Sequence, residues 1–176
     1  MEALFFLLNA VASFFTALFL LRFLMQWTRV SFAGQIGDFV VRLTNWAVKP
    51  LRRLIPGFAG FDWASLLAAF ALQALLAGIL VGLSGAPLGD APGAGPMILL
   101  FAVRGLLRLT VYILIIAVIA LALSSWINPY SPVASLARQL TRPLLDPIRR
   151  VLPTISGIDL SPLVAIVLLQ VVLIYL

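Results

Sequence analysis

Residues 44–73 read TNWAVKPLRRLIPGFAGFDWASLLAAFALQ, and residues 141–170 read TRPLLDPIRRVLPTISGIDLSPLVAIVLLQ. The two stretches align at a constant offset of 97 positions, and 12 of the 40 positions in 36–75 match their partners in 133–172. The matches are chemically varied, since they include a Pro-x-Arg-Arg-x-x-Pro core, a following Gly-x-Asp and a glutamine. Chance does not produce such a set, so the sequence predicts a tandem duplication.

The composition of the chain indicates that its solvent is a lipid bilayer. Of its 176 residues, 63% are hydrophobic and only 10% are charged, whereas a soluble domain is roughly half apolar and a quarter charged. The apolar residues also fall in blocks rather than evenly along the chain. The net charge of +6 therefore bears first on membrane topology and anionic headgroups, and we expect no nucleic-acid partner.

Four of the apolar blocks are long enough, or nearly long enough, to cross a bilayer, which needs about 20 residues. The sequence predicts an all-α membrane protein with four transmembrane helices at about 3–25, 63–83, 109–126 and 160–176. We interpret the first helix as an uncleaved span, because Glu2 stands where a signal peptide has basic residues.

Two arginines, Arg104 and Arg108, lie inside the apolar run that holds the third span. A charge in the middle of a bilayer is costly. We therefore favour an interpretation in which both side chains reach the headgroups at the outer interface, and the third span begins after them. The alternative is that they pair with a partner inside the helix bundle.

The duplication divides the chain into a first repeat (1–83), a linker (84–96) and a second repeat (97–176). The linker, SGAPLGDAPGAGP, is rich in Gly, Pro and Ala. Each repeat contains two spans, an even number, so both repeats insert in the same direction. We expect a pseudo-twofold axis along the membrane normal, as in parallel repeats, which disfavours an inverted-repeat carrier.

Between its two spans each repeat has a basic amphipathic segment, at 35–56 and at 132–153. At about 100° per residue the apolar side chains gather on one face and the charged ones lie opposite. We expect each segment to lie as an interfacial helix in the inner headgroup region. Prolines shared by the two segments are predicted to break each one into a helix and a short basic turn, which ends at Pro56 or Pro153.

The arginines of these segments form the candidate binding site. One interpretation is a membrane-surface brace that fixes topology, and the sharper one is a site for lipid, an anion or a protein partner. The candidate residues are Arg42, Arg52, Arg53, Arg142, Arg149 and Arg150. Because basic residues in short loops face the cytoplasm, we expect both segments on that side and both termini outside.

Polar residues inside the spans are the second group of candidates. Gln73 and Gln170 occupy equivalent depths, and their amides are costly against lipid. We expect them to hydrogen-bond across helices, either to each other or, for Gln73, to the polar stripe of the first span that includes Asn9. A polar constriction in a transport pathway is the alternative.

Two further sets of positions have predicted structural roles. Asp62 and Asp159 each precede a span and are predicted to cap it, with ion coordination as the alternative. Ala74, Gly78 and Gly82 are spaced four apart. Such a small-residue seam suits close packing within the molecule, or in a homodimer or higher homo-oligomer.

Enzymatic chemistry is not expected of this chain. It has no cysteine and no histidine, which removes thiolate metal sites, the usual haem ligation and every triad that uses imidazole. No carboxylate is predicted at mid-membrane, where proton-coupled transporters usually need one. We therefore predict no catalytic residue, no metal and no cofactor.

The two quoted stretches resemble the YggT family of bacterial membrane proteins, which also occurs in chloroplasts. Residues 141–170 are similar to the signature half of the family, and 44–73 look like a weaker first copy, which departs at Trp46 and Lys49. The resemblance implies a multi-pass protein of the bacterial inner membrane. It also implies a link to osmotic stress tolerance and potassium homeostasis, while plastid relatives are linked to haem assembly or nucleoid partition.

From the residues we favour a non-enzymatic membrane scaffold or assembly factor whose basic turns bind membrane-protein partners or anionic lipids. The alternative is a small oligomeric ion channel, or a channel modulator, with Gln73, Gln170 and Asn9 along its route. Osmotic tolerance is attached to either function through the family resemblance alone.

Overall fold

The computed structural model describes residues 2–55, 57, 60–83, 94–152 and 159–176. Helices make up this part of the chain, which contains no β-strand: α1 (Glu2–Trp27), α2 (Gln35–Leu54), α3 (Trp63–Leu83), α4 (Ala94–Ile127), α5 (Pro132–Val151) and α6 (Ser161–Tyr175). The predicted all-helical class is confirmed. The predicted segment ends at Pro56 and Pro153, and the linker positions 84–93, lie outside the described residues.

Among the described residues, three helices are long and apolar enough to cross a membrane: Ala3–Trp27, Trp63–Leu83 and Gly95–Ile127. The fourth apolar helix, α6, is shorter, with 15 residues. Large apolar side chains project outward from the molecule as well as inward, which is the pattern of helices surrounded by lipid rather than water. The chain is therefore suited to association with a membrane.

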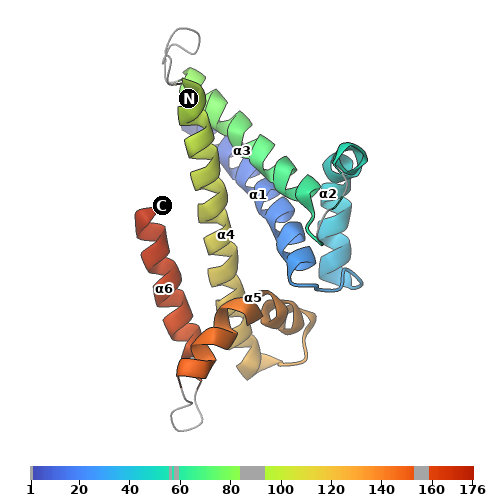
Figure 1. Ribbon diagram of the computed structural model, residues 1–176, viewed down its shortest axis with the longest axis vertical. Coiled ribbons are helices and arrows are strands. Elements are labelled where there is room, and N and C mark those ends of the chain that lie inside the picture. Colours follow the sequence, from blue (N-terminus) through green and yellow to red (C-terminus); the bar gives the residue numbers. More distant parts are fainter. Residues whose placement is uncertain (1, 56, 58–59, 84–93, 153–158) are drawn as a thin grey trace.

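The long helix α4 occupies the centre of the molecule (Figure 1). It contacts α1 and α3 of the first repeat and α5 and α6 of the second. α3 packs on α1 and α4, whereas α6 packs on α4 and α5, on the other side of α4. Because α4 is continuous from Ala94, the predicted span at 109–126 is the second part of a longer helix.

Each amphipathic segment forms one helix, which corrects the prediction that prolines divide it. Pro50 lies inside α2, and Pro143 and Pro147 lie inside α5. A proline removes one backbone hydrogen bond and kinks a helix, but the bonds on either side can continue it. Figure 1 accordingly shows α2 bending in its second half.

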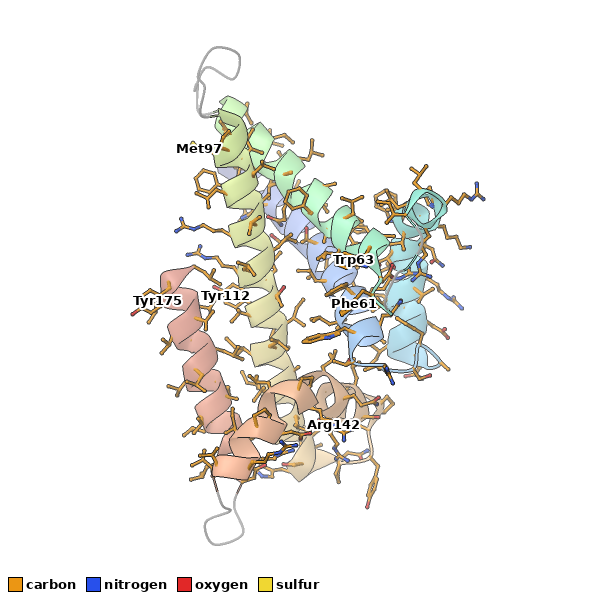
Figure 2. All side chains as sticks on the ribbon, in the orientation of Figure 1. Phe61, Trp63, Met97, Tyr112, Arg142 and Tyr175 are labelled. Carbon is orange, nitrogen blue, oxygen red and sulfur yellow. The ribbon has the colours of Figure 1, made fainter. Side chains whose placement is uncertain are left out.

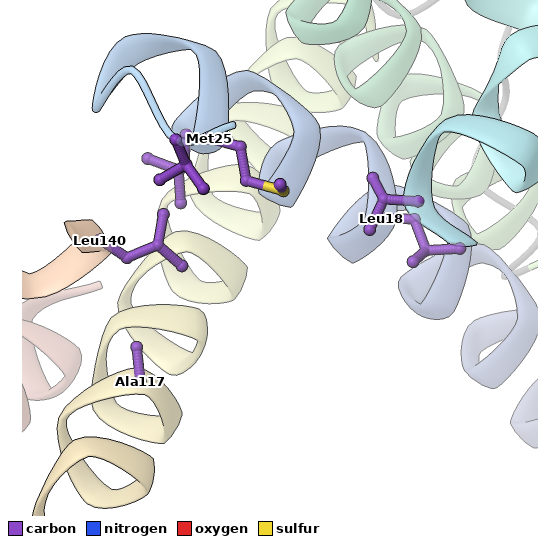
Figure 3. Packing of buried hydrophobic residues seen from close by; sticks show 7 residues of the cluster. Leu18, Met25, Ala117 and Leu140 are labelled. Atoms are coloured by element: carbon purple, nitrogen blue, oxygen red, sulfur yellow. The ribbon is translucent and has the colours of Figure 1, made fainter. Parts of the chain in front are cut away.

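The two repeats meet in a buried apolar cluster near the C-terminal halves of α1 and α4 (Figure 3). Met25 of α1, Val40 of α2, Ala117 of α4 and Leu140 of α5 all belong to it. Between helices surrounded by lipid, such side chains stabilise the fold through van der Waals packing, because lipid is as apolar as they are. The cluster brings α2 and α5 into contact.

Small residues allow α3 and α4 to approach closely. A Cβ on Gly78 of α3 would lie 3.9 Å from Ile98 Cδ1 of α4, an ordinary contact distance. Gly105 of α4 packs so tightly against Gln73 that a Cβ there would overlap Oε1. At Gly78 the predicted row of small residues therefore faces a helix of the same molecule. The other two residues of the row, Ala74 and Gly82, are half-buried.

Candidate functional site

A buried polar cluster joins α1, α2 and α3 at the end of the molecule where α2 lies. Arg22 projects from α1, Arg52 from the last turn of α2, and Asp62 directly precedes α3. The side chains of Arg22 and Asp62 are 6% and 1% exposed, whereas that of Arg52 is 43% exposed. We name Arg22, Arg52, Asp62 and Ser65 the first aspartate site.

The carboxylate of Asp62 is the centre of this site. Arg52 donates from Nη2 to Oδ2 at 2.7 Å and from Nε to Oδ1 at 3.3 Å. Ser65 donates its hydroxyl to Oδ2 at 2.6 Å and its backbone N–H to Oδ1 at 3.3 Å. The backbone contact has the geometry of an N-terminal cap on α3. Asp62 therefore links the end of α2 to the start of α3.

Arg22 brings a second guanidinium to the same carboxylate. Its Nε lies 3.4 Å from Asp62 Oδ2, and its Nη1 donates to Thr44 Oγ1 at 2.7 Å and to Asn45 Oδ1 at 3.0 Å. Nε itself makes no hydrogen bond within the described residues. A buried charge is stable only when it is paired, so Arg22 depends on both α2 and Asp62.

The turn between α2 and α3 carries Asp62 back toward α2. Gly60 has φ of 81°, a left-handed conformation that favours glycine because it has no Cβ. Gln26 donates to the Gly60 carbonyl at 3.4 Å and accepts from Arg52 at 3.2 Å. Phe61 stacks on Phe23 of α1 with ring centroids 6.2 Å apart, and Figure 2 shows Phe61 and Trp63 beside each other at this turn.

The second repeat has a shallower version, which we name the second aspartate site: Arg149, Asp159 and Ser161. Arg149 Nε donates to Asp159 Oδ2 at 2.9 Å, and the side chains are 42% and 36% exposed. The backbone N–H of Ser161 donates to Asp159 Oδ1 at 2.9 Å. α4, which is the first span of the second repeat, has no charged residue after Arg108. No buried arginine reaches this site from the described residues.

The surroundings of both aspartates lower their pKa. Burial raises the pKa of Asp62, but hydrogen bonds from Arg52 and Ser65 outweigh burial, and the pKa lies below its ordinary value. Burial likewise opposes the effects of Ser161 and Arg149 at Asp159, whose pKa is also lowered. A carboxylate that is held ionised in this way is a poor proton acceptor.

The two arginines of each Arg-Arg pair have different roles. The first of each pair, Arg52 or Arg149, closes onto the aspartate that follows it by 10 residues. The second, Arg53 or Arg150, is exposed and makes no ion pair with any described residue. The outward-facing arginines therefore remain available to a ligand.

The other basic residues singled out from the sequence also fall into paired and unpaired arginines. Arg142 pairs with Asp146 at 3.2 Å on the surface of α5. Arg42 is exposed on α2, and Arg104 and Arg108 are exposed on α4. Within the described part of the chain these three have no acidic partner within 4.0 Å, so pairing of Arg104 or Arg108 inside the bundle does not occur there.

The structure brings two of the three predicted intramembrane residues together, Gln73 and Asn9, and leaves Gln170 apart from them. Gln73 is buried and donates from Nε2 to Thr16 Oγ1 at 3.2 Å, and it lines a groove of about 420 Å³ together with Asn9. Asn9 also accepts a hydrogen bond from Ser13. Gln170 is exposed on α6. The expected contact between the two glutamines is therefore wrong, because α6 packs on a different side of α4 from α3.

The site also contains a residue that the sequence interpretation missed. Arg22 is the only charged residue between positions 3 and 25. A charge within an apolar span implies a buried partner, and this signal was sufficient to single it out. Its partner was less obvious, because Asp62 lies 40 positions along the chain, directly before the next span.

The chemistry open to this arrangement is recognition by charge and hydrogen bonds. The described residues hold no group of three metal-ligating side chains. Ser65 donates to Asp62, whose carboxylate also pairs with Arg22 and Arg52, so this pair is not an activated nucleophile.

Comparisons with known proteins place this arrangement in a family. The CCB3/YggT family matches residues 1–83 and 100–176, one segment for each repeat. The "Uncharacterized protein YggT" of Escherichia coli K12 is 35% identical over 173 residues, covering 98% of this chain and 88% of that protein. A Pseudomonas aeruginosa protein is 35% identical over 169 residues, with coverage of 95% and 84%.

A Vibrio alginolyticus protein is 33% identical over 175 residues, covering 97% of this chain and 91% of that protein. No solved structure matches the chain. Each matched segment contains one copy of the arginine–aspartate motif. The chain therefore belongs to the CCB3/YggT family, of which it carries two tandem units.

Proposed function

We propose that this chain is a four-span protein of the bacterial inner membrane that acts as a non-enzymatic scaffold or assembly factor. In this proposal its basic surface, at the cytoplasmic end, binds anionic lipid headgroups or a membrane-protein partner. α6 is the fourth span. At about 1.5 Å per residue its 15 residues extend about 22 Å, which a locally thinned bilayer accommodates.

The position of the tryptophans supports an interfacial place for α2 and α5. Trp27 ends α1 shortly before α2, Trp63 begins α3 after α2, and Trp126 lies in the last turn of α4 shortly before α5. Trp46 lies on α2. Tryptophan is enriched where a membrane meets water. A headgroup position for α2 and α5 follows.

The observation that carries the proposal is the outward position of Arg53 and Arg150. Each is held at the end of an amphipathic helix by a neighbour that closes onto an aspartate. The basic side chains Arg42, Lys49 and Arg138 are exposed on the same two helices. Each such charge contributes about 1 kcal/mol of attraction to an anionic surface.

The contacts of the polar intramembrane residues favour a scaffold over the channel alternative. A shared route through both repeats needs Gln73 and Gln170 along one path. Gln73 instead bonds to Thr16 between α1 and α3, and Gln170 projects from the outside of α6. Osmotic tolerance comes to the proposal from the family resemblance, as the cellular role in which the scaffold acts.

The test is a binding measurement on the purified chain with dioleoyl phosphatidylglycerol in mixed micelles, read by native mass spectrometry. Replacing Arg53 and Arg150 with Gln is expected to weaken binding roughly 30-fold, because two charges at about 1 kcal/mol each are lost. The matched control replaces Arg104 and Arg108 with Gln, which removes the same charge from α4.

Equal losses in the two double variants would contradict a specific basic surface. The channel alternative is measured separately as potassium flux into liposomes. If the native chain conducts potassium and Gln73→Leu abolishes that flux, the scaffold proposal is wrong and the chain is a channel.

A further inference from the structure

We infer that one face of α6 pairs with the same face of a second copy of this chain. The face consists of Leu163, Val167, Gln170 and Ile174, and we name it the α6 seam. The inference rests on the proposed position of α6 across the membrane. It adds to that proposal a defined interface and a defined partner.

The α6 seam is exposed along its whole length. Leu163, Val167 and Ile174 are among the exposed large apolar residues, and Gln170 is exposed as well. The opposite face of α6 is already occupied, since Ala165 and Leu169 are buried against neighbouring helices. The seam is therefore a second face, with no cover from the described part of the chain.

The spacing of the seam is that of a helix pair. Its residues follow one another at intervals of four, three and four. This is the alternation at which two helices interdigitate with a slight left-handed supercoil. α6 contains no charged residue, so two copies approach without like-charge repulsion. Leu163, Val167 and Ile174 provide the apolar contacts of such an interface.

Gln170 identifies the occupant of the seam. An amide that faces hydrocarbon lacks hydrogen-bond partners, and within the described residues Gln170 makes no hydrogen bond. Its counterpart Gln73 is satisfied by Thr16, and Gly105 makes room for it.

A lipid chain that covered the seam would leave the Gln170 amide unpaired. A second α6 solves this problem, because a carboxamide both donates and accepts. Two glutamines related by a twofold axis satisfy each other reciprocally. A single polar residue at a core position also fixes the register of a helix pair. The partner that this chemistry fits is therefore α6 of another copy.

Disulfide cross-linking tests the pairing in native membranes, because the full chain has no cysteine of its own. Val167→Cys lies in the seam, and Leu168→Cys is its matched control. These two side chains are 55% and 51% exposed but lie on different faces of α6. Oxidation is expected to give dimers at least tenfold more efficiently from Val167→Cys. Equal cross-linking of the two variants would overturn the seam.

A second measurement addresses the glutamine, using the oligomeric state of the purified chain by native mass spectrometry. Gln170→Leu is expected to raise the dimer dissociation constant about threefold to tenfold, and Gln170→Asn to restore most of the affinity. Gln73→Leu is the control and leaves the dimer intact. A Gln170→Leu dimer as tight as the native one overturns the reciprocal amide pair.

Failure of the interface and failure of the membrane proposal are distinguishable. Tyr175→Cys at the end of α6 is labelled in intact cells with a membrane-impermeant maleimide. Labelling without seam cross-linking overturns the dimer and leaves the fourth span in place. Cross-linking at the seam without labelling of Tyr175→Cys supports the pairing of α6, and it shows that the C-terminal end of α6 does not lie outside the cell.

Discussion

The two aspartate sites differ in depth although their arginine and aspartate have the same spacing in sequence. Both have an arginine that closes onto an aspartate 10 residues later. In the first repeat Arg22 reaches the aspartate from α1, and Asp62 is 1% exposed. In the second, α4 has no charged residue after Arg108, and Asp159 is 36% exposed. The local motif sets the pairing, and a residue from another helix sets the burial.

The largest difference is expected when each aspartate is neutralised. Asp62→Asn leaves Arg22 buried with no opposite charge, and breaking a buried pair in this way costs about 3–5 kcal/mol. The free energy of unfolding, obtained by denaturant titration of the purified chain in mixed micelles, measures the loss. A loss below about 1 kcal/mol would show that Arg22 does not need Asp62.

Acidification is expected to imitate this substitution. The pKa of Asp62 lies below its unfolded value near 3.8. A carboxyl whose pKa falls on folding contributes stability above the unfolded pKa and loses that contribution as the pH falls through the folded pKa.

The native chain should therefore lose stability below about pH 4 and approach the Asp62→Asn variant. Melting temperatures measured between pH 3 and pH 7 test this expectation. An Asp62→Asn curve as steep as the native curve in this range would assign the acid sensitivity to other groups.

Gly105→Ala is expected to lower stability by an intermediate amount. Gly105 contacts Gln73, which is buried, whereas its counterpart Gln170 is exposed. A Cβ at Gly105 overlaps Gln73 Oε1, and overpacking of this kind costs about 1–3 kcal/mol. Gly78→Ala is the control, since its Cβ meets Ile98 at an ordinary distance. Thermal unfolding of both variants provides the measurement. Equal stability would mean that Gln73 moves aside freely.

Asp159→Asn is expected to have the smallest effect. The side chains of Arg149 and Asp159 are 42% and 36% exposed, and pairs of such exposure contribute about 0.2–1 kcal/mol. If Asp159→Asn lowers the free energy of unfolding by as much as Asp62→Asn does, exposure does not explain the difference between the two sites.

Much of the helical arrangement was accessible from the sequence, because apolar blocks and basic segments alternate clearly. The 97-residue offset also aligned Arg52 with Arg149 and Asp62 with Asp159 before any contact was known. Their closure onto each other was not anticipated. Capping was the predicted role of the aspartates, and the arginines were assigned to ligands without distinguishing the first of each pair from the second.

Two expectations failed for physical reasons that involve the whole molecule. Pro50 and Pro147 do not end their helices, because a kink within an amphipathic helix retains most of its backbone bonds. Gln170 does not meet Gln73, because the two repeats do not pack their second spans on the same side of α4. Repeat symmetry in a sequence predicts equivalent elements, and it does not predict equivalent neighbours.

The buried Arg22, which only the first repeat has, has a consequence for how such a chain evolves. When a protein forms a symmetric pair from two identical subunits, every substitution appears in both halves at once. A buried arginine that suits one half is then imposed on the other. When the two units are joined in one chain, each position can be substituted in one half alone. The first half therefore keeps a buried, ionised cluster of Arg22, Arg52 and Asp62, while the corresponding aspartate of the second half remains open to water.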